Sequence, residues 1–117
     1  KKYFDGNREL IVRFMKATLE GSYRGLADEK WAKEVLAKEF KLSDPRVINI
    51  AYNDFKAQMP ENAMPTNAAT ENVLAQLQSF GMKLKSQKME DYVDTSIIDA
   101  LIKDGTLAGL QKKYGKP

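Results

Sequence analysis

The sequence predicts an all-α protein of five or six short helices with essentially no strand. Apolar residues recur at the three- and four-residue spacing of an α-helix along most of the chain, and capping residues precede most of these stretches. The composition agrees, because 117 residues with 43% hydrophobic and 30% charged side chains suit one globular domain with a single core. We therefore expect residues 1–117 to form a single helical region.

Composition also excludes several classes of chemistry. Histidine and cysteine are both absent, which excludes disulfides, thiolate and His-based zinc sites, and Ser-His or Cys-His catalysis. No long apolar run is present, so no transmembrane helix is predicted. The net charge of +3 is small and spread out, whereas nucleic-acid binders usually carry a denser basic face. We expect no enzymatic activity, no cofactor, no metal and no nucleic-acid partner.

The first helix is expected from about Arg8 to Tyr23, after a turn at residues 5–7. Asn7 is expected to accept hydrogen bonds from the first helical turn, and Gly21 and Gly25 weaken the helix end. The charged face offers two favourable pairs at a spacing of four residues, Glu9 with Arg13 and Glu20 with Arg24. The apolar stripe comprises Leu10, Ile11, Phe14, Met15 and Leu19.

The next two helices begin with capping aspartates. Asp28 precedes one, and Asp44 precedes the other with Pro45 at its first position, where the missing N–H has no cost. Only Lys41 and Leu42 remain between the helices, so we expect an antiparallel-like pair. The apolar stripes are Trp31, Ala32, Val35, Leu36 and Phe40, then Val47, Ile48, Ala51, Tyr52 and Phe55.

Two prolines at positions 60 and 65 predict an extended connection over residues 59–66. A fourth helix then begins near Asn67 and ends before Gly81, which suits the position after a helix end. A polar link over residues 83–88 leads to a short helical turn near residues 89–92. The apolar stripe of the fourth helix comprises Val73, Leu74, Leu77 and Phe80.

Two short helices complete the chain. Asp94 or Thr95 is expected to cap the fifth, Gly105 to end it, and Thr106 to cap the last. Their apolar stripes are Ile97, Ile98, Leu101 and Ile102, then Leu107, Leu110 and Tyr114. No internal repeat and no sustained heptad is present, so a coiled coil is disfavoured.

Two clusters could hold an ion, and each has a plainer interpretation. The acidic cluster lacks the tight glycine turn of a calcium loop, so we interpret its members as helix caps and dipole partners. This cluster comprises Glu90, Asp91, Asp94 and Asp99. Gly21 and Gly25 with Arg24 could suggest a phosphate cradle, but they follow a helix rather than a strand, which favours close packing or fraying.

Basic and amide residues offer two further candidate sites. Lys83, Lys85 and Lys88 could contact nucleic acid, but Glu90 and Asp91 balance them, which favours a solvated loop. The third helix carries outward-facing polar residues, as a helix-turn-helix recognition helix does, although any solvated helix looks alike. These residues are Arg46, Asn49, Asn53 and Lys56.

Aromatic and hydroxyl side chains could line a small-ligand pocket. Most of the aromatic residues are better explained as core or rim, and Tyr23 and Tyr92 are least tied to a stripe. The aromatic set comprises Tyr3, Tyr23, Trp31, Tyr52, Tyr92 and Tyr114. Thr66, Asn67 and Thr70 follow the proline-rich connection, where capping is the expected role.

Three stretches form an ordered set of motifs over nearly the whole chain. The first is NRELIVRFMKATLEGSY at residues 7–23, and the second is Asp44-Pro45-Arg46-Val47. The third runs from ENVL at residues 71–74 through Phe80-Gly81 to DYVDTSIIDAL at residues 91–101. Together they resemble the C-terminal part of ABC-transporter substrate-binding proteins of the nitrate/taurine/alkanesulfonate type, a group that includes thiamine-precursor binders.

The resemblance implies a C-terminal helical fragment of a two-lobed α/β fold, the type II periplasmic binding protein-like fold, whose members are about two to three times this length. It implies capture of a small anionic or heterocyclic solute for delivery to an ABC permease, outside the cytoplasm in the periplasm or on a lipid anchor. The cleft residues would lie mostly upstream. It assigns no ligand-binding residue to this chain, and we expect this part alone not to bind solute.

A helical layer without its sheet exposes an apolar face, so we expect the isolated chain to self-associate or to exchange helices between copies. Two alternatives stay open from the residues alone. One is a small helical nucleic-acid-binding module of helix-turn-helix type, which would bind duplex DNA in a salt-sensitive way. The other is a helical adaptor that binds protein partners through an exposed apolar groove.

Overall fold

The fold is all-helical, as predicted. A computed structural model describes residues 2–59, 63–86 and 88–116, which form seven α-helices and one 3₁₀ helix and contain no strand. The elements are α1 (Lys2–Gly6), α2 (Arg8–Ala27), α3 (Glu29–Glu39), α4 (Pro45–Gln58), α5 (Asn67–Ser79), η1 (Met89–Asp91), α6 (Ser96–Lys103) and α7 (Thr106–Tyr114). The expected number of helices was too low, because a turn was predicted where α1 ends.

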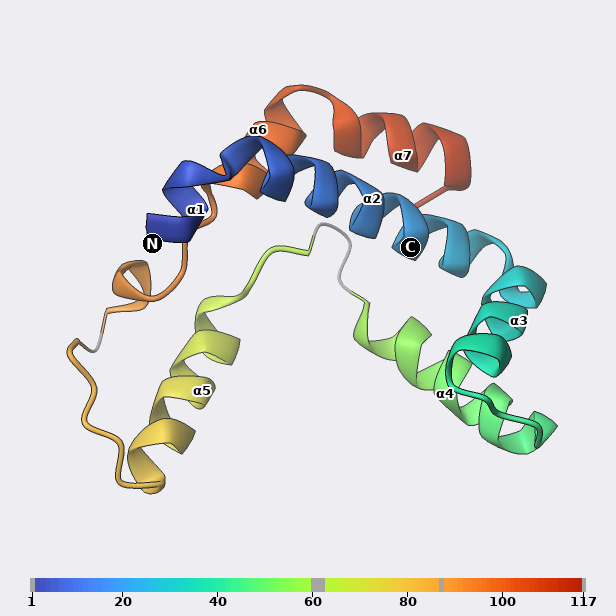
Figure 1. Ribbon diagram of the computed structural model, residues 1–117, viewed down its shortest axis with the longest axis horizontal. Coiled ribbons are helices and arrows are strands. Elements are labelled where there is room, and N and C mark those ends of the chain that lie inside the picture. Colours follow the sequence, from blue (N-terminus) through green and yellow to red (C-terminus); the bar gives the residue numbers. More distant parts are fainter. Residues whose placement is uncertain (1, 60–62, 87, 117) are drawn as a thin grey trace.

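The helices form an open arch (Figure 1). Helix α2 is the roof, α6 and α7 lie along it, the α3–α4 pair forms one leg, and α5 forms the other. The radius of gyration is 17.0 Å, whereas a compact chain of this length has about 13 Å. One copy of the chain therefore does not close into a compact body.

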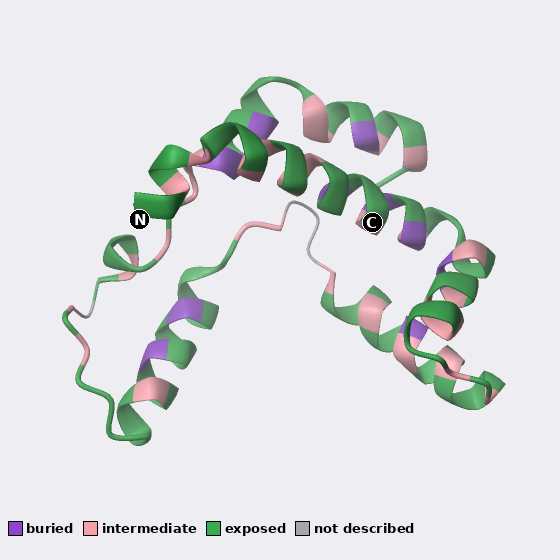
Figure 2. Cartoon of the chain, in the orientation of Figure 1, coloured by how far each residue is buried: buried purple, intermediate pink, exposed green. Residues whose placement is uncertain are grey.

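The main core lies where α2 meets the two C-terminal helices. Leu19 and Tyr23 of α2 pack against Ile97 and Leu101 of α6 and Leu110 of α7. Leu19 and Leu101 are 2% and 1% exposed and are the most deeply buried large side chains. In Figure 2 the buried positions of α2, α6 and α7 lie together along the roof. The core thus joins the two ends of the chain.

Polar contacts run beside this core and tie the same helices together. Arg8 Nη1 donates to Ser96 Oγ (3.1 Å), Lys16 Nζ to Asp104 Oδ2 (2.9 Å), and Lys113 Nζ to Glu20 Oε1 (2.8 Å). The hydrogen bond from Lys113 is the main cause that lowers the pKa of Glu20. The expected ion pair between Glu20 and Arg24 is therefore replaced, and the Arg24 guanidinium lies 4.1 Å from the ring centroid of Trp31 instead.

Three of the expected helix caps are confirmed. Asp28 Oδ1 accepts from the Trp31 N–H at 3.0 Å, and Asp44 Oδ1 accepts from the Arg46 N–H at 2.8 Å. Thr66 Oγ1 accepts from the Ala69 N–H at 3.1 Å. Pro45 is the first residue of α4, as expected. Helices α3 and α4 pack against each other across their short connection, so that pairing is also confirmed.

Two other cap assignments were wrong, and one of two alternatives was right at a third helix. The Asn7 side chain donates to the Tyr3 carbonyl at 2.8 Å because α1 ends directly before it, so it does not cap α2. Thr106 does not cap α7; Asp104 Oδ1 accepts from the Thr106 N–H at 2.9 Å, and Gly105 turns the chain with φ 82°. At the start of α6, Asp94 rather than Thr95 is the acceptor, since Asp94 Oδ1 binds the Ser96 N–H at 3.0 Å.

The connections agree with the expected breaks where the structure describes them. Helix α4 ends at Gln58 and α5 begins at Asn67, while Pro60 lies outside the described residues. The link over residues 83–88 has no helix at its described positions, and Gln87 is outside them. The predicted turn near residues 89–92 is the 3₁₀ helix η1.

Two helices end in the same motif with different residues at the critical position. After α5, Gly81 has φ 79°, its N–H donates to the Gln78 carbonyl, and the Met82 N–H donates to the Leu77 carbonyl. After α3, Lys41 takes the equivalent left-handed place with φ 53°. Only glycine adopts this conformation without steric cost. The end of α3 is therefore strained and the end of α5 is not.

We expect Lys41→Gly to raise the free energy of unfolding by about 1 kcal/mol, because it relieves the left-handed strain. Gly81→Ala is the matched opposite change and is expected to lower the free energy by about 1 kcal/mol. Urea denaturation followed by circular dichroism measures both. Equal shifts of one sign would contradict the assignment of the two C-terminal caps.

Asp104 predicts a dependence of stability on pH. Hydrogen bonds from Thr106 and from Lys16 lower its pKa from 3.8 to about 2. Between these values the unfolded chain binds the proton more readily, so the stabilisation is complete above about pH 4 and is lost as the pH falls towards 2. Asp104→Asn is therefore expected to unfold more easily than wild type near neutral pH and equally easily near pH 2.

Urea denaturation of the two proteins over this pH range measures the difference. Lys16→Met serves as a second variant. It is expected to narrow the pH range over which stability changes, because it removes one of the two residues that lower the pKa of Asp104. A difference between wild type and Asp104→Asn that stays constant down to pH 2 would contradict the role of the carboxylate.

Candidate functional site

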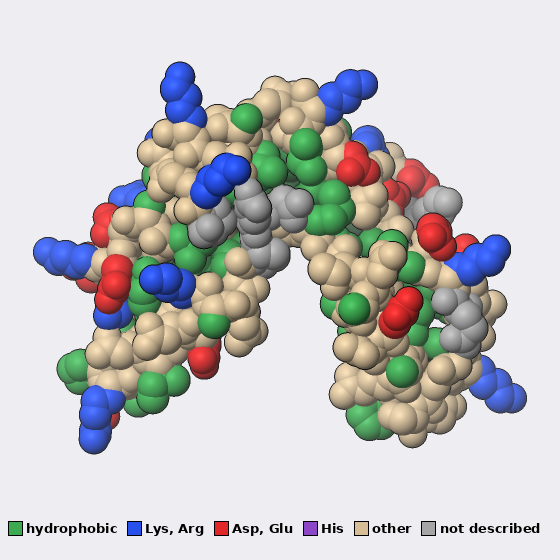
Figure 3. Space-filling view, turned by 180° about the vertical axis from the view of Figure 1, so that it is seen from behind, with side chains coloured by type: hydrophobic (Ala, Val, Ile, Leu, Met, Phe, Trp, Pro, Cys, Tyr) green, Lys and Arg blue, Asp and Glu red, His purple; other side chains and the backbone are tan. Residues whose placement is uncertain are grey.

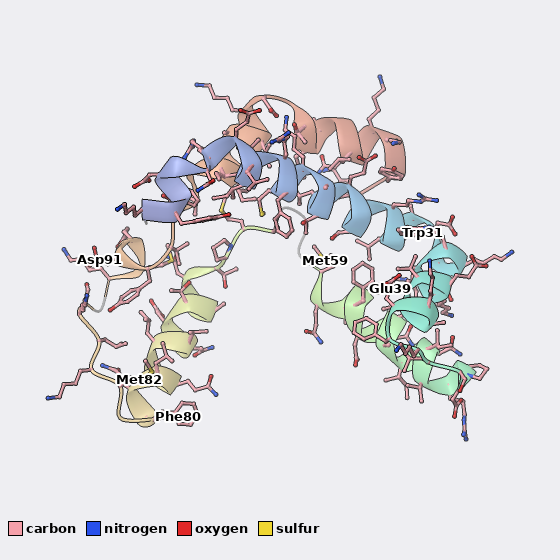
Figure 4. The ribbon with its side chains drawn as sticks, viewed as in Figure 1. Trp31, Glu39, Met59, Phe80, Met82 and Asp91 are labelled. Carbon is pink, nitrogen blue, oxygen red and sulfur yellow. The ribbon has the colours of Figure 1, made fainter. Side chains whose placement is uncertain are left out.

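A mainly apolar groove lies between α2 and the α3–α4 leg. It has a volume of about 290 Å³. We call it the α2–α3 groove, and its lining residues are Ala17, Thr18, Gly21, Ser22 and Gly25 of α2, Trp31, Ala32, Val35 and Leu36 of α3, and Phe55 of α4. Small side chains thus form one wall and large ones the other. Figure 4 places Trp31 at the junction of α2 and α3.

The two glycines of the groove have different roles. A Cβ atom at Gly25 would lie 3.1 Å from two ring carbons of Phe55, so any larger residue would push this ring away from α2. This confirms the prediction of close packing at Gly25. At Gly21 nothing lies within 4 Å of the same position, so the missing side chain leaves open space in the groove.

The lining of the groove is apolar in its chemistry. Thr18 donates its hydroxyl to the Phe14 carbonyl and Ser22 donates to the Thr18 carbonyl, both at 2.9 Å. The hydroxyls of the α2 wall are thus used within the helix itself. None of the ten lining side chains is ionisable. The groove is suited to holding apolar groups, and these ten residues offer no general acid or base.

The apolar surface continues from the groove along α2. Leu10 and Phe14 precede Ala17 and Gly21 at helical spacing, so they lie on one face. Leu10 is 48% exposed and Phe14 is 66% exposed. Helix α2 is therefore apolar on two sides, one against α6 and α7 and one open to solvent.

Large apolar side chains are also exposed on both legs. They include Phe40, Val47 and Ile50 near α3 and α4, and Val73, Phe80 and Met82 near α5. The accessible surface is 8783 Å², whereas a compact 13.2 kDa monomer has about 6,400 Å². Figure 3 shows the hollow between the legs and hydrophobic side chains on its roof.

The acidic cluster acts at helix starts, as interpreted. Asp94 accepts from the start of α6, and Asp99 Oδ2 accepts from the Thr95 hydroxyl at 2.8 Å. Glu90, Asp91 and Asp94 also line a hollow of about 280 Å³ beside Phe4. Among the described residues no group of three or more acidic side chains could hold a metal ion.

The candidate basic and amide residues do not form one continuous surface. Arg46, Asn49, Asn53 and Lys56 are exposed on α4, as expected. Arg46 Nη2 binds Asp44 Oδ2 at 2.8 Å, and this contact raises the pKa of Arg46. Val47 and Ile50 are exposed beside these residues. Lys83, Lys85 and Lys88 are exposed in the link after α5, away from α4.

The candidate aromatic residues do not gather in one pocket. Tyr23 and Tyr52 are buried, 3% and 2% exposed. Tyr23 does belong to the apolar stripe of α2, because it follows Leu19 by one turn on the core face of this helix. The Tyr92 hydroxyl exchanges two 2.9 Å hydrogen bonds with the backbone of Ser86. Tyr114 donates to Glu20 Oε1, Trp31 lies at the α2–α3 groove, and Tyr3 is exposed.

The polar residues that follow the proline-rich connection have structural roles. Thr66 caps α5, and Thr70 donates its hydroxyl to the Thr66 carbonyl at 3.1 Å. Asn67 is exposed at the first helical position. The expected capping role is confirmed for Thr66, whereas the Thr70 hydroxyl bonds within the helix.

Helix α2 and the other described helices lack the combination of length and apolarity that crossing a bilayer requires. Comparisons with known protein families, with curated proteins and with solved structures gave no match. The proposals below therefore depend on the chain's own residues and geometry.

The contact between Gly25 and Phe55 gives a test of the groove geometry. Gly25→Ala is expected to lower the free energy of unfolding by about 1–2 kcal/mol, because the overpacked contact outweighs the gain in helix propensity. Gly21→Ala, the matched control on the same helix, has open space and is expected to raise it by up to about 1 kcal/mol. Urea denaturation measures both; equal shifts would show that α4 does not contact α2 closely.

Proposed function

We propose that the chain is the C-terminal helical part of the solute-binding component of an ABC uptake transporter, of the nitrate/taurine/alkanesulfonate type. The ordered motifs at residues 7–23, 44–47 and 71–101 support this proposal, because they cover nearly the whole chain. In this proposal the helices cover a β-sheet of a two-lobed α/β protein, and the sheet is formed by other residues of the same protein.

The observation that carries the proposal is the apolar surface on two sides of α2. One side forms the core with α6 and α7, while Leu10, Phe14 and the α2–α3 groove are open. A helix at the surface of a finished domain buries one stripe only. A helix with two apolar sides is typical of an inner layer, which a sheet on the open side would complete.

In this proposal the protein captures a solute and does not transform it. Two lobes close on a small anionic or heterocyclic solute by a hinge motion, and the closed form docks on the permease outside the cytoplasm. The helices described above support one lobe, and the residues that select the solute lie mostly elsewhere. This agrees with the groove, whose ten lining side chains carry no charge to bind an anion.

The test uses the product of the whole natural open reading frame. We expect nitrate, taurine, an alkanesulfonate or a thiamine precursor to raise its melting temperature, since ligand at 100 times Kd adds about 2.7 kcal/mol of stability. The 117-residue chain is the matched control and is expected to show no shift with the same solute. A frame without an α/β segment before these helices, or no shift with any of the four solute classes, would refute the proposal.

A further inference from the structure

Helix α5 makes few tertiary contacts. Its main tertiary contact is with η1, and it forms the leg opposite the α3–α4 pair (Figure 1). Thr70 and Leu74 are buried, whereas Val73 is 54% exposed and Phe80 is 73% exposed. Figure 4 shows Phe80 and Met82 together at the free end of this leg. Among the described residues, an apolar face of α5 is therefore left largely open in this copy.

The chemistry of α5 suits burial against the α2–α3 groove. From residue 67 to residue 82 the only ionisable side chain is Glu71, although 30% of the whole chain is charged. The groove lining is likewise free of ionisable side chains. Depletion of charge on both surfaces is typical of the central part of a protein–protein interface.

The spacing of the apolar residues on α5 also suits a groove. Val73, Leu77 and Phe80 stand at i, i+4 and i+7 on α5, the usual spacing of the anchors of a helix bound in a groove. The α2 wall offers the small residues Ala17 and Gly21, whereas the space beside Gly25 is already taken by the ring of Phe55. The groove can therefore receive large side chains from a second helix.

We propose that two copies of this chain form a reciprocal dimer in which α5 of each copy lies in the α2–α3 groove of the other. One copy exposes about 2,400 Å² more surface than a compact monomer, and a stable dimer needs about 800 Å² from each partner. The two identical contacts satisfy two-fold symmetry. Within one copy, α5 and the groove are at opposite legs of the arch (Figure 1).

The first experiment compares two glycine variants of the 117-residue chain by sedimentation velocity at increasing concentration. Gly21→Lys places a long charged side chain in the groove and is expected to weaken dimerisation at least about tenfold. Gly109→Lys on α7 is the matched control, because both glycines are exposed, helical and free of neighbours within 4 Å. It is expected to leave the dimer unchanged, and circular dichroism checks that both variants stay helical.

The second experiment maps the contact by disulfide formation, which the absence of native cysteine makes specific. A Val73→Cys variant is mixed with a Val35→Cys variant, and in parallel with an Ile102→Cys variant. Val35 lines the groove, whereas Ile102 is 42% exposed on α6 and lies outside it. The mixture with Val35→Cys is expected to give the higher yield of mixed disulfide.

Three results would overturn the inference. They are a monodisperse monomer at every concentration, a dimer that Gly21→Lys and Gly109→Lys affect equally, and equal disulfide yields in the two mixtures. A double variant with Val35→Cys and Val73→Cys that closes only within one chain would also overturn it. None of these results depends on solute binding by the whole protein, so the dimer and the transport proposal can fail separately.

Discussion

The packing of α2 across α6 and α7 is the contact on which the rest of the structure depends. It buries Leu19 and Leu101 almost completely, and ionic and hydrogen-bonded contacts flank it along one face of α2. At about 25 cal/mol per Å² of apolar surface removed from water, burial is the main stabilising term, and the exposed ion pairs beside it contribute much less. Both legs of the arch are connected to α2, α6 and α7, so they keep their positions only while these three helices stay packed together.

The other side of α2 determines what the chain can do. The ring of Phe55 lies close to α2 at Gly25, and the α3–α4 leg packs on α2 mainly through α3. The open face from Leu10 to Gly21 then stays uncovered in one copy. A sheet in a longer protein and a helix from a second copy are two ways to cover the same surface, and both follow from one unsatisfied stripe on a single helix.

Local structure was largely predictable, and long-range structure was not. The caps at Asp28 and Asp44 and the end at Gly81 depend on residues within a few positions, so the sequence shows them directly. The contact of Glu20 with Lys113 joins positions 93 apart, and only the tertiary fold brings them together. The short helix α1 has too few residues for an apolar period. For the groove, a signal existed in the small residues at positions 17, 21 and 25, whose spacing of four marks a helix face open to close approach.

Because α2 packs against the last two helices of the chain, its core face has to wait for its partners during synthesis. Lys16 and its partner Asp104 are 88 positions apart, and a ribosome that adds about 5–20 residues per second needs about 4 to 18 seconds to make the second after the first. For that time the core face of α2 has no partner, although the helix is already available to fold. A nascent chain of this kind would benefit from a chaperone that shields apolar helices until translation reaches residue 110.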